Sequence, residues 1–129
     1  MQVIHAFVRS LLALDPDASV LVIGDLNDFP FSATLTALSG DALTNLVTTL
    51  PAAEQYNYVF DGNSQELGHL LVSPHLRESA NVEFDIVHVN AEFAEATRPT
   101  DHDPFLARIR FDAKENPVRR IYLPIISRN

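Results

Sequence analysis

Apolar residues near the start of the chain recur every three or four positions, from Val3 through Phe7 and Leu11 to Leu14. This spacing places them on one face of an amphipathic helix, which ends before "DPDAS" at residues 15–19. A second, shorter helix is expected over residues 32–38, with Ser32 as its N-cap and "SGD" after it. The pattern therefore predicts two helices in the first third of the chain.

Six further segments have the hydrophobic pattern of strands. "SVLVIGD" (19–25) is a short apolar run, typical of a strand buried on both faces in a sheet that helices cover. "YNYVF" (56–60) and "ELGHLLVS" (66–73) flank the turn-rich "DGNSQ", which predicts a hairpin. The other three segments are "NVEFDIVHVN" (81–90), "FLARIRF" (105–111) and "RRIYLPIIS" (119–127), the last read as an edge strand or an extended tail. We expect an α/β fold with a mixed or mostly antiparallel sheet.

Composition narrows the class of protein. The chain has 129 residues, of which 47% are hydrophobic, enough for one domain with a real core. It contains no cysteine, so any metal would be held by oxygen and imidazole ligands. The net charge of -8 argues against a broad basic surface for nucleic acid, although a bound cation could reverse this locally. No apolar run reaches the roughly 20 residues of a membrane span, and no signal peptide is recognisable, so the compartment stays open.

The first polar cluster is "GDLND", in which Asp25 and Asn27 follow a predicted strand. A carboxylate at this place can hold a hard cation or orient a water molecule. An amide two residues later can donate a hydrogen bond to a substrate oxygen. The alternative is an Asx-turn that only ties the loop to its own backbone, and short motifs of this kind match freely by chance.

The second cluster lies in "PTDHDPF", residues 99–105. Asp101 can bind a metal or fix the neighbouring imidazole, and His102 can donate a proton to a charged oxygen in a transition state. The alternative is a solvated turn with an incidental histidine. Two carboxylates, Asp101 and Asp103, around one imidazole are nevertheless an unusual choice for a free loop.

Taken together, these segments resemble the endonuclease/exonuclease/phosphatase superfamily, and most closely its bacterial extracellular-type nucleases. The resemblance runs from about Gln2 to Arg110. It includes "VIGDLNDFPFS", the hairpin "YNYVFDGNSQELGHLLVS", the strand "FDIVHVNAEF" and the final "TDHDPFLARI". Four motifs in the order of the family are far more specific than one motif alone.

The resemblance implies a role for each matched residue. Asp25 matches the acid that activates the attacking water and also binds metal, and Asn27 matches the amide that steadies the scissile phosphate. Asp101 matches a metal-binding acid, and His102 matches the imidazole that donates to the phosphate. The implied cofactor is a divalent cation, with Mg²⁺ favoured over Mn²⁺ or Ca²⁺. The implied reaction is in-line hydrolysis of a phosphodiester.

The hairpin departs from the family pattern. The family usually has Leu-Asp-His where this chain has Leu67, Gly68 and His69, so the acid that orients the catalytic imidazole is absent. Asp103 or Asp61 could replace that acid. His69 is either a substrate-binding residue or a structural residue of the hairpin. The remaining histidines, His5, His75 and His88, have no ligand spacing and are interpreted as structural.

A second departure concerns the length of the chain. The family domain is about twice as long, and its first half carries a metal-binding glutamate that has no counterpart before Asp25. The expected fold is therefore the C-terminal half of a two-sheet α/β sandwich of the DNase-like four-layer type, with helices on one face and residues 112–129 as a tail or edge strand. The sheet face without helices would expose apolar area, so we expect either a homo-oligomer or docking to a missing N-terminal half. The family suggests a secreted or cell-surface location.

Two function hypotheses follow. In the first, the chain is the C-terminal part of a metal-dependent phosphodiesterase that acts on nucleic acid. A phosphatase or a phospholipid phosphodiesterase would suit the same chemistry. In the second, it is a degenerate binding or assembly module without catalysis. On either hypothesis, we expect the isolated chain to hydrolyse phosphodiesters poorly or not at all.

Overall fold

The computed structural model describes residues 1–78 and 81–111. Their helices are α1 (Gln2–Leu14), α2 (Ala33–Ser39) and α3 (Pro74–Glu78), with 3₁₀ turns at Leu46–Thr49, Ala52–Glu54 and Glu95–Thr97. The strands are β1 (Leu21–Asp25), β2 (Thr44–Asn45), β3 (Tyr58–Phe60), β4 (Asn63–Gln65), β5 (Gly68–Val72), β6 (Asn81–Ile86) and β7 (Phe105–Arg110).

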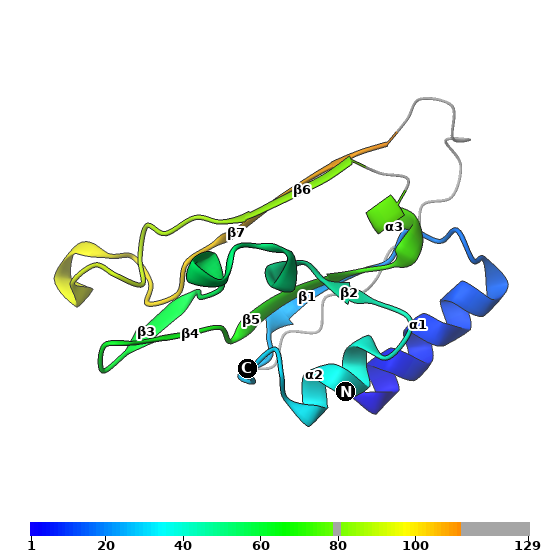
Figure 1. Cartoon of the computed structure of the whole chain (residues 1–129), viewed down its shortest axis with the longest axis horizontal. Coiled ribbons are helices and arrows are strands. Elements are labelled where there is room, and N and C mark those ends of the chain that lie inside the picture. Colours follow the sequence, from blue (N-terminus) through cyan, green and yellow to red (C-terminus); the bar gives the residue numbers. More distant parts are fainter. Residues whose placement is uncertain (79–80, 112–129) are drawn as a thin grey trace.

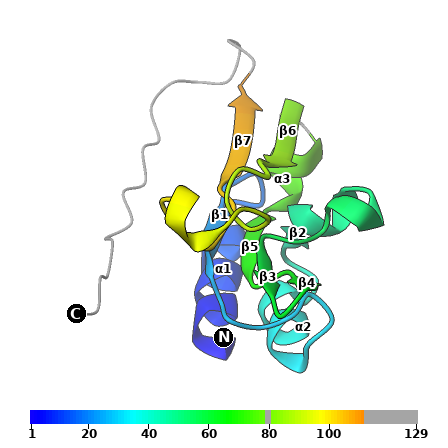
Figure 2. The same ribbon diagram turned by 90° about the vertical axis from the view of Figure 1, so that its left-hand side faces the viewer.

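The strands form three antiparallel sheets. The central sheet has the order β1-β5-β2, and β3-β4 and β6-β7 are two-stranded ribbons. Figure 1 shows α1 and α2 on one side of the central sheet and the β6-β7 ribbon on the other. Figure 2, turned by 90°, shows the same separation of α1 and α2 from the ribbon.

Strand β5 holds the layers together because it is buried along its whole length. Leu71 faces the helices and packs in a cluster with Val8 of α1 and Leu38 of α2. Leu70 and Val72 face the other way, into a cluster that β6 and β7 cover with Val82, Phe84, Phe105, Ala107 and Ile109. Because successive side chains of a strand point to opposite faces of the sheet, this one short strand contributes to two separate hydrophobic clusters.

The two helices form where the hydrophobic spacing predicts them. α1 spans Gln2–Leu14, and α2 begins after Ser32, whose hydroxyl accepts a hydrogen bond from the Leu35 amide at 3.1 Å. Gly40 ends α2 with a positive φ of 50°. Capping by a serine and termination by a glycine are local signals, and both act here as the sequence indicates.

The predicted hairpin has a different register. β3 pairs with β4 around Asp61 and Gly62, whose φ angles of 48° and 75° belong to a tight two-residue turn. Part of the segment interpreted as a linker is therefore the second strand. The segment "HLLV" lies in β5, which pairs instead with β1 and β2. In this position its apolar residues are buried in the two clusters on opposite faces of the central sheet.

The expectation that residues 19–25 are buried on both faces is wrong. β1 is an edge strand of its sheet, and Ile23 keeps 57% of its surface exposed, because helices cover only one face there. The two other expected strands correspond to β6 and β7, and β7 alternates regularly between half-buried and exposed residues. The segment 119–127 and the whole tail 112–129 lie outside the described residues.

The chain is therefore an α/β protein with antiparallel sheets. All strand pairings among residues 1–78 and 81–111 are antiparallel, and these residues form no barrel. Within those residues, no helix combines the length and the apolar character needed to cross a membrane.

Candidate functional site

An open cavity of about 530 Å³ lies at the end of β1, and it brings the two polar clusters of the sequence together. Asp25, the last residue of β1, lines it from one side, and Asp101 and His102 line it from the segment before β7. The backbone places this segment, because His102 forms an isolated antiparallel bridge with Tyr58 of β3. Asp25 and Asp101 are both exposed, so their carboxylates are accessible to solvent.

Asn27 lies beside this cavity in sequence but does not line it. Its backbone N–H donates to Oδ1 of Asp25 at 2.9 Å, and its φ is 51°. This is the geometry of an Asx-turn, which the sequence left open as the alternative. The turn holds one carboxylate oxygen of Asp25 against the loop.

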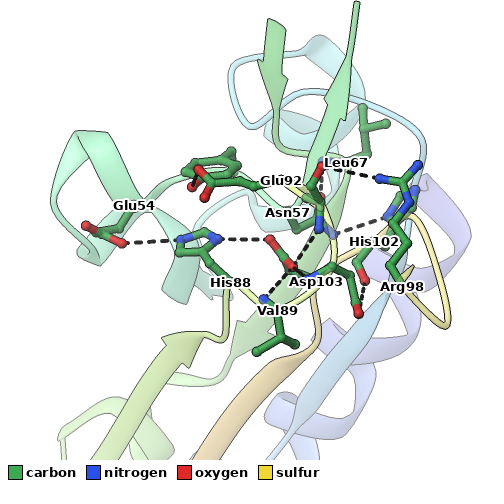
Figure 3. Close-up of polar contacts among 12 residues, drawn as sticks. Glu54, Asn57, Leu67, His88, Val89, Glu92, Arg98, His102 and Asp103 are labelled. Carbon is green, nitrogen blue, oxygen red and sulfur yellow. Dashed lines mark hydrogen bonds and ion pairs between the residues drawn. The ribbon is translucent and has the colours of Figure 1, made fainter. Parts of the chain in front are cut away.

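Contacts from Asn57, Tyr58 and Asn90 hold His102 in place. The Asn57 amide nitrogen Nδ2 lies 3.4 Å from Nδ1 of the ring, and the ring of Tyr58 stacks on it with the centroids 4.7 Å apart. The amide of Asn90 donates to the His102 carbonyl at 2.8 Å. Figure 3 shows Asn57 and His102 side by side in this network. Asn57 was missed at the sequence level, and its only signal is a polar residue between two tyrosines in "YNYVF".

Asp103 is buried at the edge of the cavity and anchors the loop after β6. Its Oδ1 accepts hydrogen bonds from the amides of Val89, Asn90 and Ala91 at 3.0, 2.7 and 2.9 Å, and its Oδ2 lies 2.9 Å from Nδ1 of His88. Burial alone would raise the pKa of Asp103, but these hydrogen bonds outweigh it and the pKa is lowered. Figure 3 shows this carboxylate between His88 and Val89.

His88 continues this network toward the surface. Its Nε2 lies 3.2 Å from Oε2 of Glu54, within ion-pair distance but without the alignment of a hydrogen bond. The ring stacks on Tyr56 at 4.2 Å between centroids. The Tyr56 hydroxyl donates to Glu92 at 2.6 Å, and this bond raises its pKa to about 12. The interpretation of His88 as a structural residue agrees with these contacts.

His69 lies in the core, with 0% of its surface exposed. Its Nδ1 is 2.9 Å from Nδ2 of Asn45, and its Nε2 is 2.8 Å from the carbonyl oxygen of Asp28. Burial lowers the pKa of His69, although the bond to the Asp28 carbonyl acts in the opposite direction. A substrate could reach this ring only if the core opened. The position is that of a structural residue and offers no support for substrate binding.

Gly68 has no room for the acid that the resemblance leads one to expect. A Cβ atom at this position would lie 2.6 Å from Nδ2 of Asn57 and 2.9 Å from the Phe105 ring. Neither Asp103 nor Asp61 replaces that acid, since Asp103 is engaged by the loop 88–91 and Asp61 lies in the exposed turn of the β3-β4 hairpin. The contact to Nδ1 of His102 comes from Asn57 instead.

Glu66 is a second residue that the sequence did not single out. It is 3% exposed, and neither carboxylate oxygen has a hydrogen-bond partner among the described residues. Burial, and then the negative charge of Asp25, raise its pKa to about 8. Glu66 therefore keeps its proton to a much higher pH than an exposed glutamate does, and no hydrophobic pattern could have predicted this.

The donor set at the cavity fits a hard divalent cation. Asp25 and Asp101 provide exposed carboxylate oxygens on the same cavity, which are the ligands that Mg²⁺, Mn²⁺ and Ca²⁺ prefer. Among the described residues, however, no group of three or more His, Asp or Glu side chains converges on one metal position. A cation held here would keep much of its water.

Comparison with protein-family models, with curated proteins and with solved structures finds no match to this chain.

Proposed function

We propose that this chain carries part of the site of a metal-dependent phosphodiester hydrolase of the endonuclease/exonuclease/phosphatase type, with nucleic acid as substrate and a DNase-like sandwich as the complete fold. The observation that supports this is the meeting of Asp25, Asp101 and His102 at one open cavity from segments far apart in sequence. The two carboxylates and the imidazole are the groups that phosphodiester hydrolysis needs.

Each group has a defined task in the proposed reaction, and Asp25 has two. Asp25 accepts a proton from the attacking water as the new P–O bond forms and the ester P–O bond breaks, and the leaving oxygen takes up a proton from solvent to give an alcohol. His102 donates a hydrogen bond to a phosphate oxygen, which stabilises the charge that develops there. Asp101 and Asp25 would hold the divalent cation, which when bound supplies Lewis-acid stabilisation of the phosphate. Asn27 contributes through the turn that it forms with Asp25.

A second candidate function is a binding or assembly module without catalysis. It is favoured by the apolar side chains that α1 leaves exposed, since Val3, Phe7 and Leu14 lie on one side of this helix. Large exposed apolar residues that gather on one face are typical of surfaces that bind another protein. The hydrolase requires Asp25 and His102 for turnover, whereas the binding module does not require them.

The test is hydrolysis of a chromogenic phosphodiester and of DNA with Mg²⁺, Mn²⁺ and Ca²⁺ in turn. The control is an Asp25→Ala/His102→Ala double variant, because a trace of contaminating nuclease would mimic activity. We expect turnover far below the usual range of about 1 to 1000 per second, dependent on the cation and lost in the double variant. Equal turnover in both proteins with all three cations would reject the enzyme and favour the binding module.

The same assay separates the substrate classes. A phosphatase would prefer a chromogenic monoester over the diester, and a phospholipid phosphodiesterase would prefer lipid vesicles over DNA. The proposal of a nuclease requires that DNA or RNA be the better substrate.

A further inference from the structure

The Asn57 amide has only one possible orientation. Asn57 is 4% exposed, and its Oδ1 accepts hydrogen bonds from the backbone amides of Leu67 at 3.1 Å and Gly68 at 3.4 Å. Two donors on one side require the oxygen there, so the NH₂ group must be on the other side. That side faces Nδ1 of His102, at 3.4 Å.

This orientation determines which nitrogen of His102 carries the proton. An NH₂ group can only donate, so Nδ1 must be the acceptor and a neutral ring carries its hydrogen on Nε2. Nε2 makes no hydrogen bond to another described residue. The ring therefore keeps its one N–H donor available while it lines the cavity with Asp25 and Asp101.

The surroundings of Asn57 preserve this contact. The absence of a side chain at Gly68 leaves the space that the amide occupies, because a Cβ there would lie 2.6 Å from Nδ2. The backbone N–H of Asp103 donates to the Asn57 carbonyl at 2.8 Å, which ties Asn57 to the segment that carries His102. Stacking on Tyr58 restrains the ring from a second direction.

We propose that Asn57 is the positioning residue of His102, which fixes the ring and selects its Nε2–H tautomer. The role in catalysis rests on the function proposed above, whereas the tautomer does not. A carboxylate at the same place would accept from Nδ1 and favour the opposite tautomer. Asn57 thus leaves the imidazole, which lines the cavity, with a free Nε2–H donor and no charged partner.

The chain contains its own reference for this arrangement. In the core, Asn45 holds His69 in the same way, with Nδ2 at 2.9 Å from Nδ1 and its Oδ1 turned to the Val47 amide at 3.3 Å. The Nε2–H of His69 then donates to the Asp28 carbonyl at 2.8 Å. His69 must therefore be an Nε2–H tautomer, and its signals calibrate those of His102 in one spectrum.

The test is a long-range ¹H–¹⁵N correlation spectrum of the imidazole nitrogens of the full chain, without cation or substrate, at a pH of about 8.5 where neutral imidazole predominates. A His102→Ala variant assigns the signals. We expect His102 and His69 to show the same pattern, with protonated Nε2 and unprotonated Nδ1. A wild-type His102 with its proton on Nδ1 would overturn the proposal, and this measurement requires no folded variant of Asn57.

An Asn57→Asp variant tests the cause. This substitution keeps the shape of the side chain but replaces the donor by an acceptor. We therefore expect Nδ1 of His102 to show the signal of a protonated nitrogen and Nε2 that of an unprotonated one, while the signals of His69 remain unchanged. The matched control is Asn63→Asp, which adds the same charge to an exposed position of the same hairpin and should leave both histidines unchanged. A His102 pattern that is the same in Asn57→Asp as in the wild type would contradict the proposal.

Where the wild type hydrolyses a phosphodiester, Asn57→Asp should lower kcat by about tenfold or more with little change in KM. An unchanged kcat would reject the catalytic role. If the wild type proves inactive while the tautomer pattern is as expected, the proposed function fails and the positioning of His102 by Asn57 stands.

Discussion

At the scale of single residues, buried polar groups decide how this protein responds to pH. A carboxyl group buried without a partner, as at Glu66, costs little free energy while it is neutral and much more when it ionises. Its pKa of about 8 in the folded protein lies above the value of 4.5 for an exposed glutamate. The folded state therefore binds a proton that the unfolded state has released between these two values.

The first prediction follows from this difference. The stability contribution of Glu66 is complete below pH 4.5, decreases as the pH rises through the interval and reaches its minimum above pH 8, with a slope of up to about 1.4 kcal/mol per unit. Glu66→Gln should remove this dependence and be the more stable protein at pH 9. Urea unfolding at several pH values measures it, with the exposed Glu95→Gln as control. Parallel pH profiles of Glu66→Gln and wild type would contradict the prediction.

The second prediction concerns the space beside Gly68. Gly68→Ala should destabilise the fold by roughly 1–3 kcal/mol, because the new Cβ meets Asn57 and the Phe105 ring at less than 3.0 Å. Gly24→Ala on the paired strand β1 is the matched control, since its Cβ would have only an ordinary contact of 3.9 Å with Leu26. Thermal or urea unfolding compares the two, and an equal effect of both substitutions would show that the space beside Gly68 is not tight.

At the scale of the elements, one carboxylate organises the loop between β6 and β7. Asp103 accepts hydrogen bonds from the three backbone amides of residues 89–91, and it also contacts the ring of His88. Asp101, two residues earlier, is exposed instead. A loop tied in this way keeps the segment 99–104 against the β3-β4 hairpin, where His102 bridges to Tyr58. The two acids of "DHD" thus have separate tasks, one in the fold and one at the cavity.

The third prediction separates these tasks. Asp103→Ala should cost roughly 1–3 kcal/mol of stability because it leaves buried amides without an acceptor, whereas Asp101→Ala should change stability by less than about 0.5 kcal/mol. The contribution of Asp103 is present above the unfolded pKa and is lost as the pH falls through its lowered folded pKa. Denaturant unfolding at neutral pH measures both variants. Similar losses in the two would contradict the division.

The elements also show what a sequence can predict. The helices α1 and α2 and the alternation of β7 depend on local spacing and capping, and they lie where the pattern indicates. The pairing partner of β5 depends on tertiary packing of its apolar side chains, which local sequence does not encode. The expected hairpin with residues 56–60 is therefore wrong, and β5 pairs with β1. Asp25, Asp101 and His102 carry a recognisable motif, but the contact of Asn57 with His102 joins residues 45 positions apart and leaves no periodic signal.

At the scale of the whole molecule, the distribution of apolar surface stands out. α1 buries Val8 against the core but exposes Val3 at 83% and Leu14 at 84%, with Phe7 between them on the same side. A helix face of this kind gains free energy when a second surface covers it. Self-association of the chain is the simplest way to do so.

The fourth prediction is therefore that the protein associates at micromolar concentration through α1. Phe7→Glu should shift the sedimentation coefficient toward that of a monomer, whereas Ala13→Glu, which adds the same charge at an exposed position on another side of α1, should have little effect. A wild-type chain that sediments as a monomer at these concentrations would contradict the prediction.

The most direct test of the proposed site is where a cation binds. Mn²⁺ added to the ¹⁵N-labelled chain broadens the signals of nearby amides, and we predict that broadening centres on residues 24–26 and 100–103. An Asp25→Asn/Asp101→Asn double variant should lose this broadening, while the weak effect at the exposed acid Asp17 stays as the reference for nonspecific binding. The contradicting result is that the amide signals of both segments remain as sharp as those of the rest of the chain, or that they broaden equally in the double variant. In either case the cavity does not bind a cation, and the account of a metal-dependent phosphodiester site is wrong.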